Sequence, residues 1–257
     1  MTYREAILLG ESILQKANIV DAKNDAWLLL AMACKIDHTY YYVHMDEEMS
    51  QEQIREYQAL LSKRAERIPL QYIVGEQEFM GLKFRVNSNV LIPRQDTETV
   101  VEFAIEQAGK MKKCGSVLDM CCGSGAIAVS MAKALPKADV TACDCSEEAL
   151  ETAKRNAVKN GVEKHVDFKK TDMFEIEKRG KVTHIKGKFD MIISNPPYIP
   201  RAVIDTLQPE VRDHEPMLAL DGGDDGLDFY RKITAESVQY LRKGGRLLFE
   251  IGYDQGE

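Results

Sequence analysis

The residues best suited to chemistry are Asn195-Pro196-Pro197-Tyr198, which follow the apolar run at residues 189–194. Two consecutive prolines cannot continue a strand, and Asn195 is restricted towards extended backbone because it precedes proline. The predicted loop presents the Asn195 side-chain carbonyl and the Pro196 main-chain carbonyl as two hydrogen-bond acceptors, with Tyr198 as an aromatic platform. Two acceptors aimed at one point suit a planar NH2 group. A plain Pro-Pro turn would explain the prolines but neither flanking residue.

An NH2 group of this kind is a poor nucleophile, because its lone pair is delocalised. Acceptors that hold both protons outside the amide plane could draw the nitrogen towards tetrahedral geometry and localise the lone pair. Methyl transfer from a sulfonium would then require positioning of the reactants more than a strong base.

A second candidate site lies in residues 119–128 and at Asp144. Gly123 and Gly125 allow the backbone to approach a ligand, and the helix that follows offers free N–H donors. Asp144 lies about 20 residues further on, where nucleotide-binding sheets place an acid that holds ribose hydroxyls. The alternatives are a glycine turn with a purely structural role and an acid that caps the next helix, although Ser146 already suits that position. An adenosine-type cofactor is predicted, and NAD remains a competitor at this point.

The elements that position these residues change character along the chain. Helical periodicity dominates residues 1–69, and residues 70–94 are typical of a β-hairpin linker. From residue 95 helices alternate with strands, and the predicted strands are 116–120, 139–144, 165–170, 189–194 and 245–251. Repeated βα units predict a parallel sheet with helices on both faces, whose ligands bind beyond the carboxyl ends of the strands.

Composition limits the possible partners and compartments. The chain has 257 residues, of which 44% are apolar, enough for one large α/β domain and a smaller one. No apolar run is long enough to cross a bilayer and the charged N-terminus is unlike a signal peptide, so we expect a cytoplasmic protein without membrane association. The net charge of −7 disfavours a DNA partner without excluding folded RNA. The six cysteines form no CxxC pair, so no metal site is predicted.

Nearly the whole chain resembles the release-factor glutamine methyltransferases (the HemK/PrmC family). NPPY alone also occurs in adenine-N6 DNA methyltransferases, so the other segments make the resemblance specific. These segments are PLQYIVGEQEFMGLKFRV (69–86), VLIPRQDTE (90–98), DMCCGSGAIA (119–128), NPPYIP (195–200) and EPMLALDGGDDGLDFYRKI (215–233).

The resemblance implies a Rossmann-like domain that transfers a methyl group from S-adenosylmethionine to a glutamine N5 nitrogen, leaving S-adenosylhomocysteine. The glutamine would be that of the Gly-Gly-Gln motif in peptide chain release factors, docked by the N-terminal helices. Arg94, Thr97 and Glu98 would help to close the site. The implied catalytic residues are Asn195, Pro196, Pro197 and Tyr198. The implied cofactor-binding residues are Cys121, Cys122, Gly123, Ser124, Gly125, Asp144, Met173 and Asn195.

The chain departs from the family pattern in three places. Cys121 replaces the first glycine of the loop, so backbone approach there must tolerate a side chain. Gln95-Asp96 stands where Pro-Glu is commoner. Family members continue with two further strands, and we expect the natural chain to extend beyond residue 257, because the fifth strand would otherwise leave a hydrophobic edge.

Other functions are less consistent with these residues. A nucleic-acid amino-methyltransferase acting on adenine or guanine would be expected to have a basic face. A dinucleotide-dependent oxidoreductase or a non-catalytic binding protein would leave Asn195 to Tyr198 unexplained. Separately, oxidation of Cys121, Cys122, Cys143 and Cys145 could block cofactor binding; the alternative is that these thiols simply pack as small apolar groups.

Overall fold

The computed structural model describes residues 1–178 and 180–256, which form two compact units. The smaller unit consists of residues 1–75 and 208–214, and the larger unit contains the remaining described residues. The division falls at Gly75, beyond the boundary expected after Pro69, because Leu70 and Ile73 pack against the core of the smaller unit. Among the described residues, no helix has the length and apolar character needed to cross a membrane.

The smaller unit is helical, and its two longest helices begin at side-chain caps. Thr2 and Ser50 each begin a helix, and each side chain accepts a hydrogen bond from the backbone N–H three residues later. The side chain of that later residue, Glu5 or Gln53, accepts a hydrogen bond from the backbone N–H of Thr2 or Ser50 in return. Its core includes the fully buried Leu29, Leu30 and Tyr57. The helices are α1 (Tyr3–Lys16), α2 (Ala22–Cys34), α3 (His38–His44), α4 (Gln51–Ala65) and α5 (Leu70–Val74).

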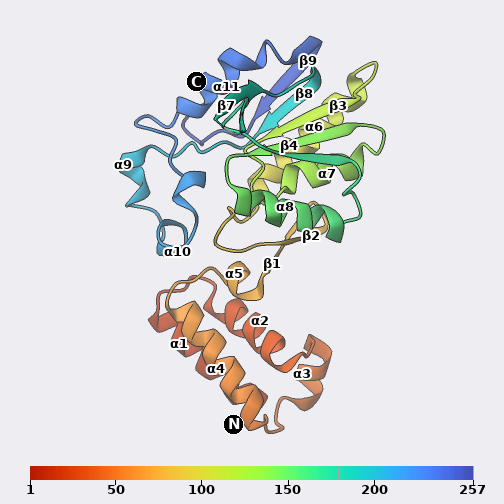
Figure 1. Ribbon diagram of the computed structural model, residues 1–257. Helices are drawn as coiled ribbons and strands as arrows, with labels where there is room; N and C mark the ends of the chain where they lie inside the picture. The colour runs from red at the N-terminus through yellow and green to blue at the C-terminus, as the bar shows by residue number, and fades with distance from the viewer. Residues whose placement is uncertain (179, 257) are drawn as a thin grey trace. The chain divides into compact units, whose positions relative to one another are not determined.

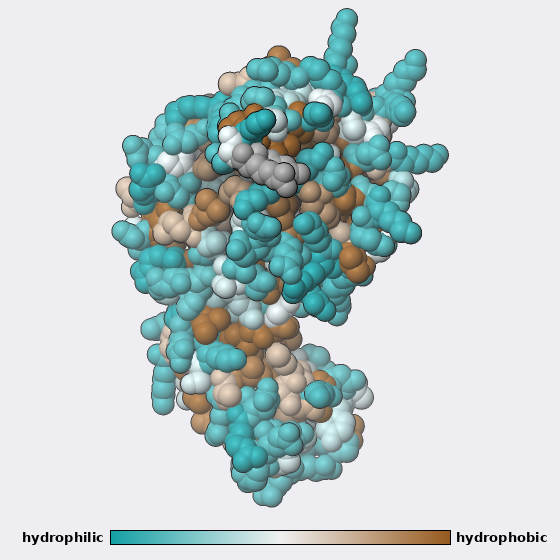
Figure 2. Space-filling model, in the orientation of Figure 1, coloured by the Kyte–Doolittle hydropathy of each residue, from teal (hydrophilic) through white to brown (hydrophobic). Residues whose placement is uncertain are grey.

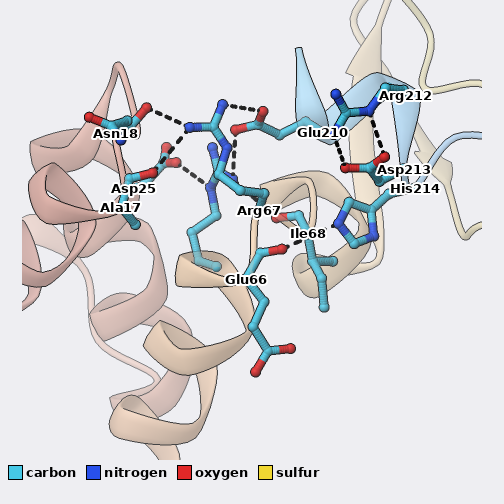
Figure 3. A network of polar contacts seen from close by, with 11 residues as sticks. Ala17, Asn18, Asp25, Glu66, Arg67, Ile68, Glu210, Arg212, Asp213 and His214 are labelled. Atoms are coloured by element: carbon cyan, nitrogen blue, oxygen red, sulfur yellow. Dashed lines mark hydrogen bonds and ion pairs between the residues drawn. The ribbon is translucent and has the colours of Figure 1, made fainter. Parts of the chain in front are cut away.

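A late segment of the chain returns to this unit as α10 (Pro209–Arg212) (Figure 3). Glu210 accepts hydrogen bonds from Arg64 at 3.1 Å and from Arg67 at 2.5 Å. Arg64 also donates to Asp25 at 2.7 Å. These contacts tie residues 208–214 to α2, to α4 and to the turn after α4.

The larger unit is built on a parallel sheet with the strand order β5-β4-β3-β8-β9 (Figure 1). Every pairing within this sheet is parallel, as expected for consecutive βα units. The order reverses between β3 and β8, which makes their carboxyl ends the expected ligand site. The strands are β3 (Ser116–Met120), β4 (Asp139–Asp144), β5 (Val166–Lys170), β8 (Phe189–Ser194) and β9 (Leu241–Phe249).

The two faces of this sheet belong to different hydrophobic clusters, because side chains alternate along each strand. Val117 and Ile193 face a cluster that includes α6 (Gln95–Lys110), α7 (Ala126–Ala134) and α8 (Glu147–Lys159). Leu118 and Ile192 face the other cluster, which includes Ile233 of α11 (Asp228–Ser237). The sheet is therefore covered on both sides, as predicted.

Smaller elements lie outside this sheet. β1 (Glu76–Phe79) and β2 (Leu82–Arg85) form the predicted hairpin, and β6 (Glu175–Lys178) and β7 (Lys181–His184) form a second hairpin that was not predicted. The remaining elements are the short helix α9 (Arg201–Ile204) and the 3-10 turn η1 (Met217–Ala219). The predicted strands 116–120, 139–144 and 189–194 form over those residues, whereas the last strand ends at Phe249 and leaves Glu250 in the following loop.

Candidate active site

A cavity of about 220 Å³ lies within the larger unit, at the carboxyl ends of β3, β4 and β8. Its wall combines residues of the glycine turn after β3 with residues of the loop at 195–198 after β8. Among the residues that line it are Val90, Arg94, Thr97, Cys121, Cys122, Gly123, Ser124, Asp144, Met173, Asn195, Pro197, Leu218 and Phe229. Of the predicted cofactor residues, Gly125 does not line this cavity, and neither do Pro196 and Tyr198 of the predicted catalytic group.

The turn after β3 adopts backbone conformations that favour glycine. Gly123 has a φ of 52°, and a Cβ atom added there would meet no other atom within 4 Å. Cys121, which replaces the usual first glycine, has a φ of 63°, so its backbone is left-handed although the residue has a side chain. The turn thus keeps the glycine-like geometry at position 121.

Gly125 is needed for packing rather than for lining the cavity. Its φ is 78°, and an added Cβ would lie 2.9 Å from the Cβ of Ala153 in α8. The glycine therefore allows α7 to begin close against α8.

Asp144 ends β4 and supports the glycine turn. Its Oδ2 accepts a hydrogen bond from the Gly123 N–H at 2.8 Å, and its Oδ1 accepts one from the Ser146 N–H at 2.9 Å. Burial raises the pKa of Asp144, and these N–H groups act in the opposite direction. Ser146 caps α8 through its own hydroxyl, so Asp144 is not needed as the cap. Asp144 also lines the cavity, and a carboxylate can accept more hydrogen bonds than these two.

Asn195 follows β8 and is held from two sides. The preceding Ser194 hydroxyl donates to the Met120 carbonyl at 2.7 Å, which fixes the end of β8 against β3. The Asn195 Nδ2 donates to the Thr97 hydroxyl of α6 at 3.3 Å. With its NH2 group engaged by Thr97, the Asn195 Oδ1 is available as an acceptor for a ligand.

Tyr198 points away from the cavity lining. Its hydroxyl lies 3.4 Å from Glu250 Oε1, and burial together with the Glu250 charge raises the Tyr198 pKa to about 12. Two glycines allow the chain to pass close to its backbone: a Cβ on Gly222 would lie 2.7 Å from Tyr198 Cα, and one on Gly226 would overlap the Tyr198 carbonyl. The sequence singled out the Gly-rich segment at 221–226, but its contact with Tyr198 required the structure.

Arg94, which lines the cavity, forms an ion pair with Glu215. Arg94 Nη2 contacts both carboxylate oxygens of Glu215 at 2.7 Å, and Glu215 is 6% exposed. Burial raises the pKa of Glu215, which Arg94 counteracts. Pro216 and Leu218, which follow Glu215, also line the cavity. Arg94 was expected at the site, whereas Glu215, the first residue of the segment at 215–233, was given no role from the sequence.

The four cysteines near the glycine turn are free thiols. Burial raises the pKa of Cys121 and Cys122, and it raises that of Cys143 to about 12. Because the thiolate is the reactive form, these shifts favour the packing alternative for Cys121, Cys122 and Cys143, whereas Cys145 is exposed and its role stays untested. Among the described residues, no group of three His, Cys, Asp or Glu side chains is placed to hold a metal ion.

Known families match both units. The PrmC N-terminal domain matches residues 5–75, and the methyltransferase small domain matches residues 101–209. Among solved structures, the catalytic domain of hMettl16 in complex with MAT2A 3'UTR hairpin 6 is similar over 76% of this chain and 68% of that chain, with a TM-score of 0.50 and 18% identity. This likeness concerns the fold alone. The fold, the matched methyltransferase domain and the relatives described next define the class of the protein, a Rossmann-like methyltransferase dependent on S-adenosylmethionine.

Full-length relatives then identify the family. The release factor glutamine methyltransferase of Geobacter sulfurreducens is 42% identical over 100% of this chain and 86% of its own length. The relative of the same name from Clostridium botulinum is 37% identical over 99% of this chain and 88% of its own length. The chain belongs to the release factor glutamine methyltransferase family.

Proposed function

We propose that this protein transfers a methyl group from S-adenosylmethionine to the N5 nitrogen of the glutamine in the Gly-Gly-Gln motif of peptide chain release factors, in the cytoplasm. The family name of its relatives supports the choice of substrate. The observation that carries the chemistry is the position of Asn195, which lines the same cavity as Gly123 and Asp144 and has its amide nitrogen held by Thr97.

The residues around the cavity fit the cofactor. Gly123 leaves open space where a side chain would stand, and Asp144 retains acceptor sites suited to ribose hydroxyls. We assign the cofactor site to the cavity-lining members of the predicted group, with Gly125 supporting the turn. S-adenosylmethionine, when bound, supplies an electrophilic methyl group on a sulfonium. The protein supplies the shape and the acceptors that orient it.

The residues after β8 would activate the substrate amide by orienting its protons. The Asn195 Oδ1 and the Pro196 carbonyl would each accept a hydrogen bond from one N–H of the NH2 group, which localises the nitrogen lone pair. These acceptors would hold the nitrogen towards the methyl group that bound S-adenosylmethionine would supply, and the proton lost from the methylated nitrogen would pass to solvent. Pro197 would pack against the substrate from the cavity wall, and Tyr198 would hold the loop through Glu250.

The helical unit offers a surface for a protein partner. Figure 2 shows hydrophobic side chains among the hydrophilic ones on this unit, and its exposed residues include Val20, Tyr42 and Val43 at 87%, 67% and 71%. Exposed apolar and aromatic side chains are common at protein interfaces. Together with the net charge of −7, they favour a protein substrate over a nucleic acid.

The test is incubation with labelled S-adenosylmethionine and a purified release factor, either wild type or with the Gly-Gly-Gln glutamine changed to alanine. Parallel reactions contain RNA or DNA. We expect label in the wild-type factor alone. Label in RNA or DNA, with none in the factor, would refute the proposed substrate and leave the methyltransferase class intact.

A further inference from the structure

Glu250 is a buried acid that the proposed reaction does not use. It follows β9, and its N–H donates to the Ser194 carbonyl at 3.1 Å, beside the strand end that carries Asn195. The residue is only 6% exposed. Its Oε1 lies 3.4 Å from the Tyr198 hydroxyl, whereas its Oε2 has no hydrogen-bond partner of normal geometry among the described residues.

The groups near this carboxyl come from the active-site loop, from α6 and from Tyr230 of α11, whose hydroxyl donates to the Glu250 main-chain carbonyl at 2.8 Å. Burial raises the pKa of Glu250, and the charge of Asp96 adds to this effect. Hydrogen-bonding interactions with Thr97, Tyr198 and Asn195 act in the opposite direction. The carboxyl therefore lies within reach of two residues of the predicted catalytic loop and of the Thr97 hydroxyl that holds Asn195.

The order of donors and acceptors in this cluster determines which end of the Asn195 amide faces the cavity. A hydroxyl has one proton, and a carboxylate can only accept. Because Thr97 and Asn195 both interact with the Glu250 carboxylate, the Asn195 NH2 must point towards Thr97 and Glu250. The Asn195 Oδ1 then faces the cavity. If the Asn195 amide were turned the other way, its NH2 group would face the NH2 group of the substrate, and no hydrogen bond would form between them.

We propose that Glu250 is a positioning residue that fixes the amide orientation of Asn195, directly and together with Thr97. The expected loss of kcat rests on the proposed function, whereas the expected orientation of the Asn195 amide does not. Glu250 does not line the cavity, so it acts through Asn195 and Tyr198 rather than on the substrate.

The test replaces Glu250 by glutamine, which keeps the shape of the side chain but adds an NH2 donor beside Thr97. With release factor as substrate, we expect kcat to fall about tenfold or more, with KM and cofactor affinity within about twofold of the wild type. Thr97→Val removes the hydroxyl that accepts from Asn195. The rate losses in the double variant should be less than multiplicative, because both changes act on the same Asn195 amide.

A second readout does not depend on activity. In protein with labelled asparagine, the Asn195 side-chain NH2 should exchange with solvent about tenfold faster or more in Glu250→Gln than in the wild type. This readout separates the two proposals: absence of methyl transfer by the wild-type enzyme would refute the proposed function, while the exchange rate still tests the role of Glu250.

Asp190→Asn is the matched control, because Asp190 is also a buried acid of this sheet but begins β8 at the opposite end. Its Oδ2 accepts from the Gly115 and Ser116 N–H groups and from Arg242. This variant should lower the melting temperature without changing kcat or the Asn195 exchange rate. Unchanged exchange in Glu250→Gln, or multiplicative rate losses in the double variant, would overturn the positioning role.

Discussion

Asn195 is restrained at its backbone and at its side chain by different parts of the larger unit. The following proline restricts its backbone, and Thr97 of α6 holds its amide nitrogen at 3.3 Å. Oriented acceptors act on the substrate without reorganising during the reaction, which is why one such group has a large effect on rate.

Asn195→Ala removes the side-chain acceptor while leaving the glycine turn and Asp144 in place. We expect methyl transfer to fall by about 10²-fold or more, with cofactor affinity changed far less. Single-turnover transfer and calorimetric cofactor binding measure the two effects. Asn160→Ala is the control, since Asn160 follows α8 and does not line the cavity. Equal losses of rate in both variants would contradict the role assigned to Asn195.

At the scale of elements, the turn between β3 and α7 depends on glycine for two separate reasons. Gly123 leaves space at the cavity, whereas Gly125 lets α7 pack against Ala153 of α8. Both also have positive φ values. The structure thus separates roles that are indistinguishable in the sequence pattern.

Gly125→Ala should lower the free energy of unfolding by about 2–4 kcal/mol, because backbone strain and overpacking add. Gly161→Ala is the matched variant: its φ is 70°, but an added Cβ meets nothing within 4 Å. It should cost only about 1 kcal/mol from strain. Denaturant unfolding distinguishes the two, and similar losses would show that the contact with Ala153 is unimportant.

At the scale of the whole molecule, the chain leaves the larger unit after Leu207 and returns at Glu215. The intervening residues are held in the helical unit by Glu210 with Arg64 and Arg67 (Figure 3). Burial raises the pKa of Glu210, but hydrogen bonds and charge from the two arginines outweigh it, so the pKa lies below its usual value.

A lowered pKa means that this carboxylate stabilises the fold above the ordinary glutamate pKa and that the contribution is lost as pH falls through the lowered value. Glu210→Gln should therefore reduce the free energy of unfolding by about 1–2 kcal/mol at neutral pH, and the difference should shrink in acid. Asp213→Asn, in the exposed pair with Arg212, should remain close to wild type. A difference for Glu210→Gln that grows as pH falls would contradict this account.

The sequence was most informative where one segment determines the structure. β3, β4 and β8 follow from short apolar runs, and Asn195 and Asp144 stand out because they end such runs. The hairpin of β6 and β7 was missed because its strands are short and rich in charged residues, without a buried alternating face. Glu215 and Glu250 were missed because their partners lie far along the chain: Arg94 for the first, Thr97 and Tyr198 for the second.

The central claim, glutamine methylation of a release factor, is tested most directly by locating the methyl group. After incubation with S-adenosylmethionine, the release factor is digested and its Gly-Gly-Gln peptide is sequenced by tandem mass spectrometry, beside a reaction with Asn195→Ala enzyme. The account predicts one added methyl group on the glutamine side chain with wild-type enzyme and very little with the variant. A methyl group on another residue, or an unmodified peptide from an enzyme that methylates RNA or DNA, would contradict it.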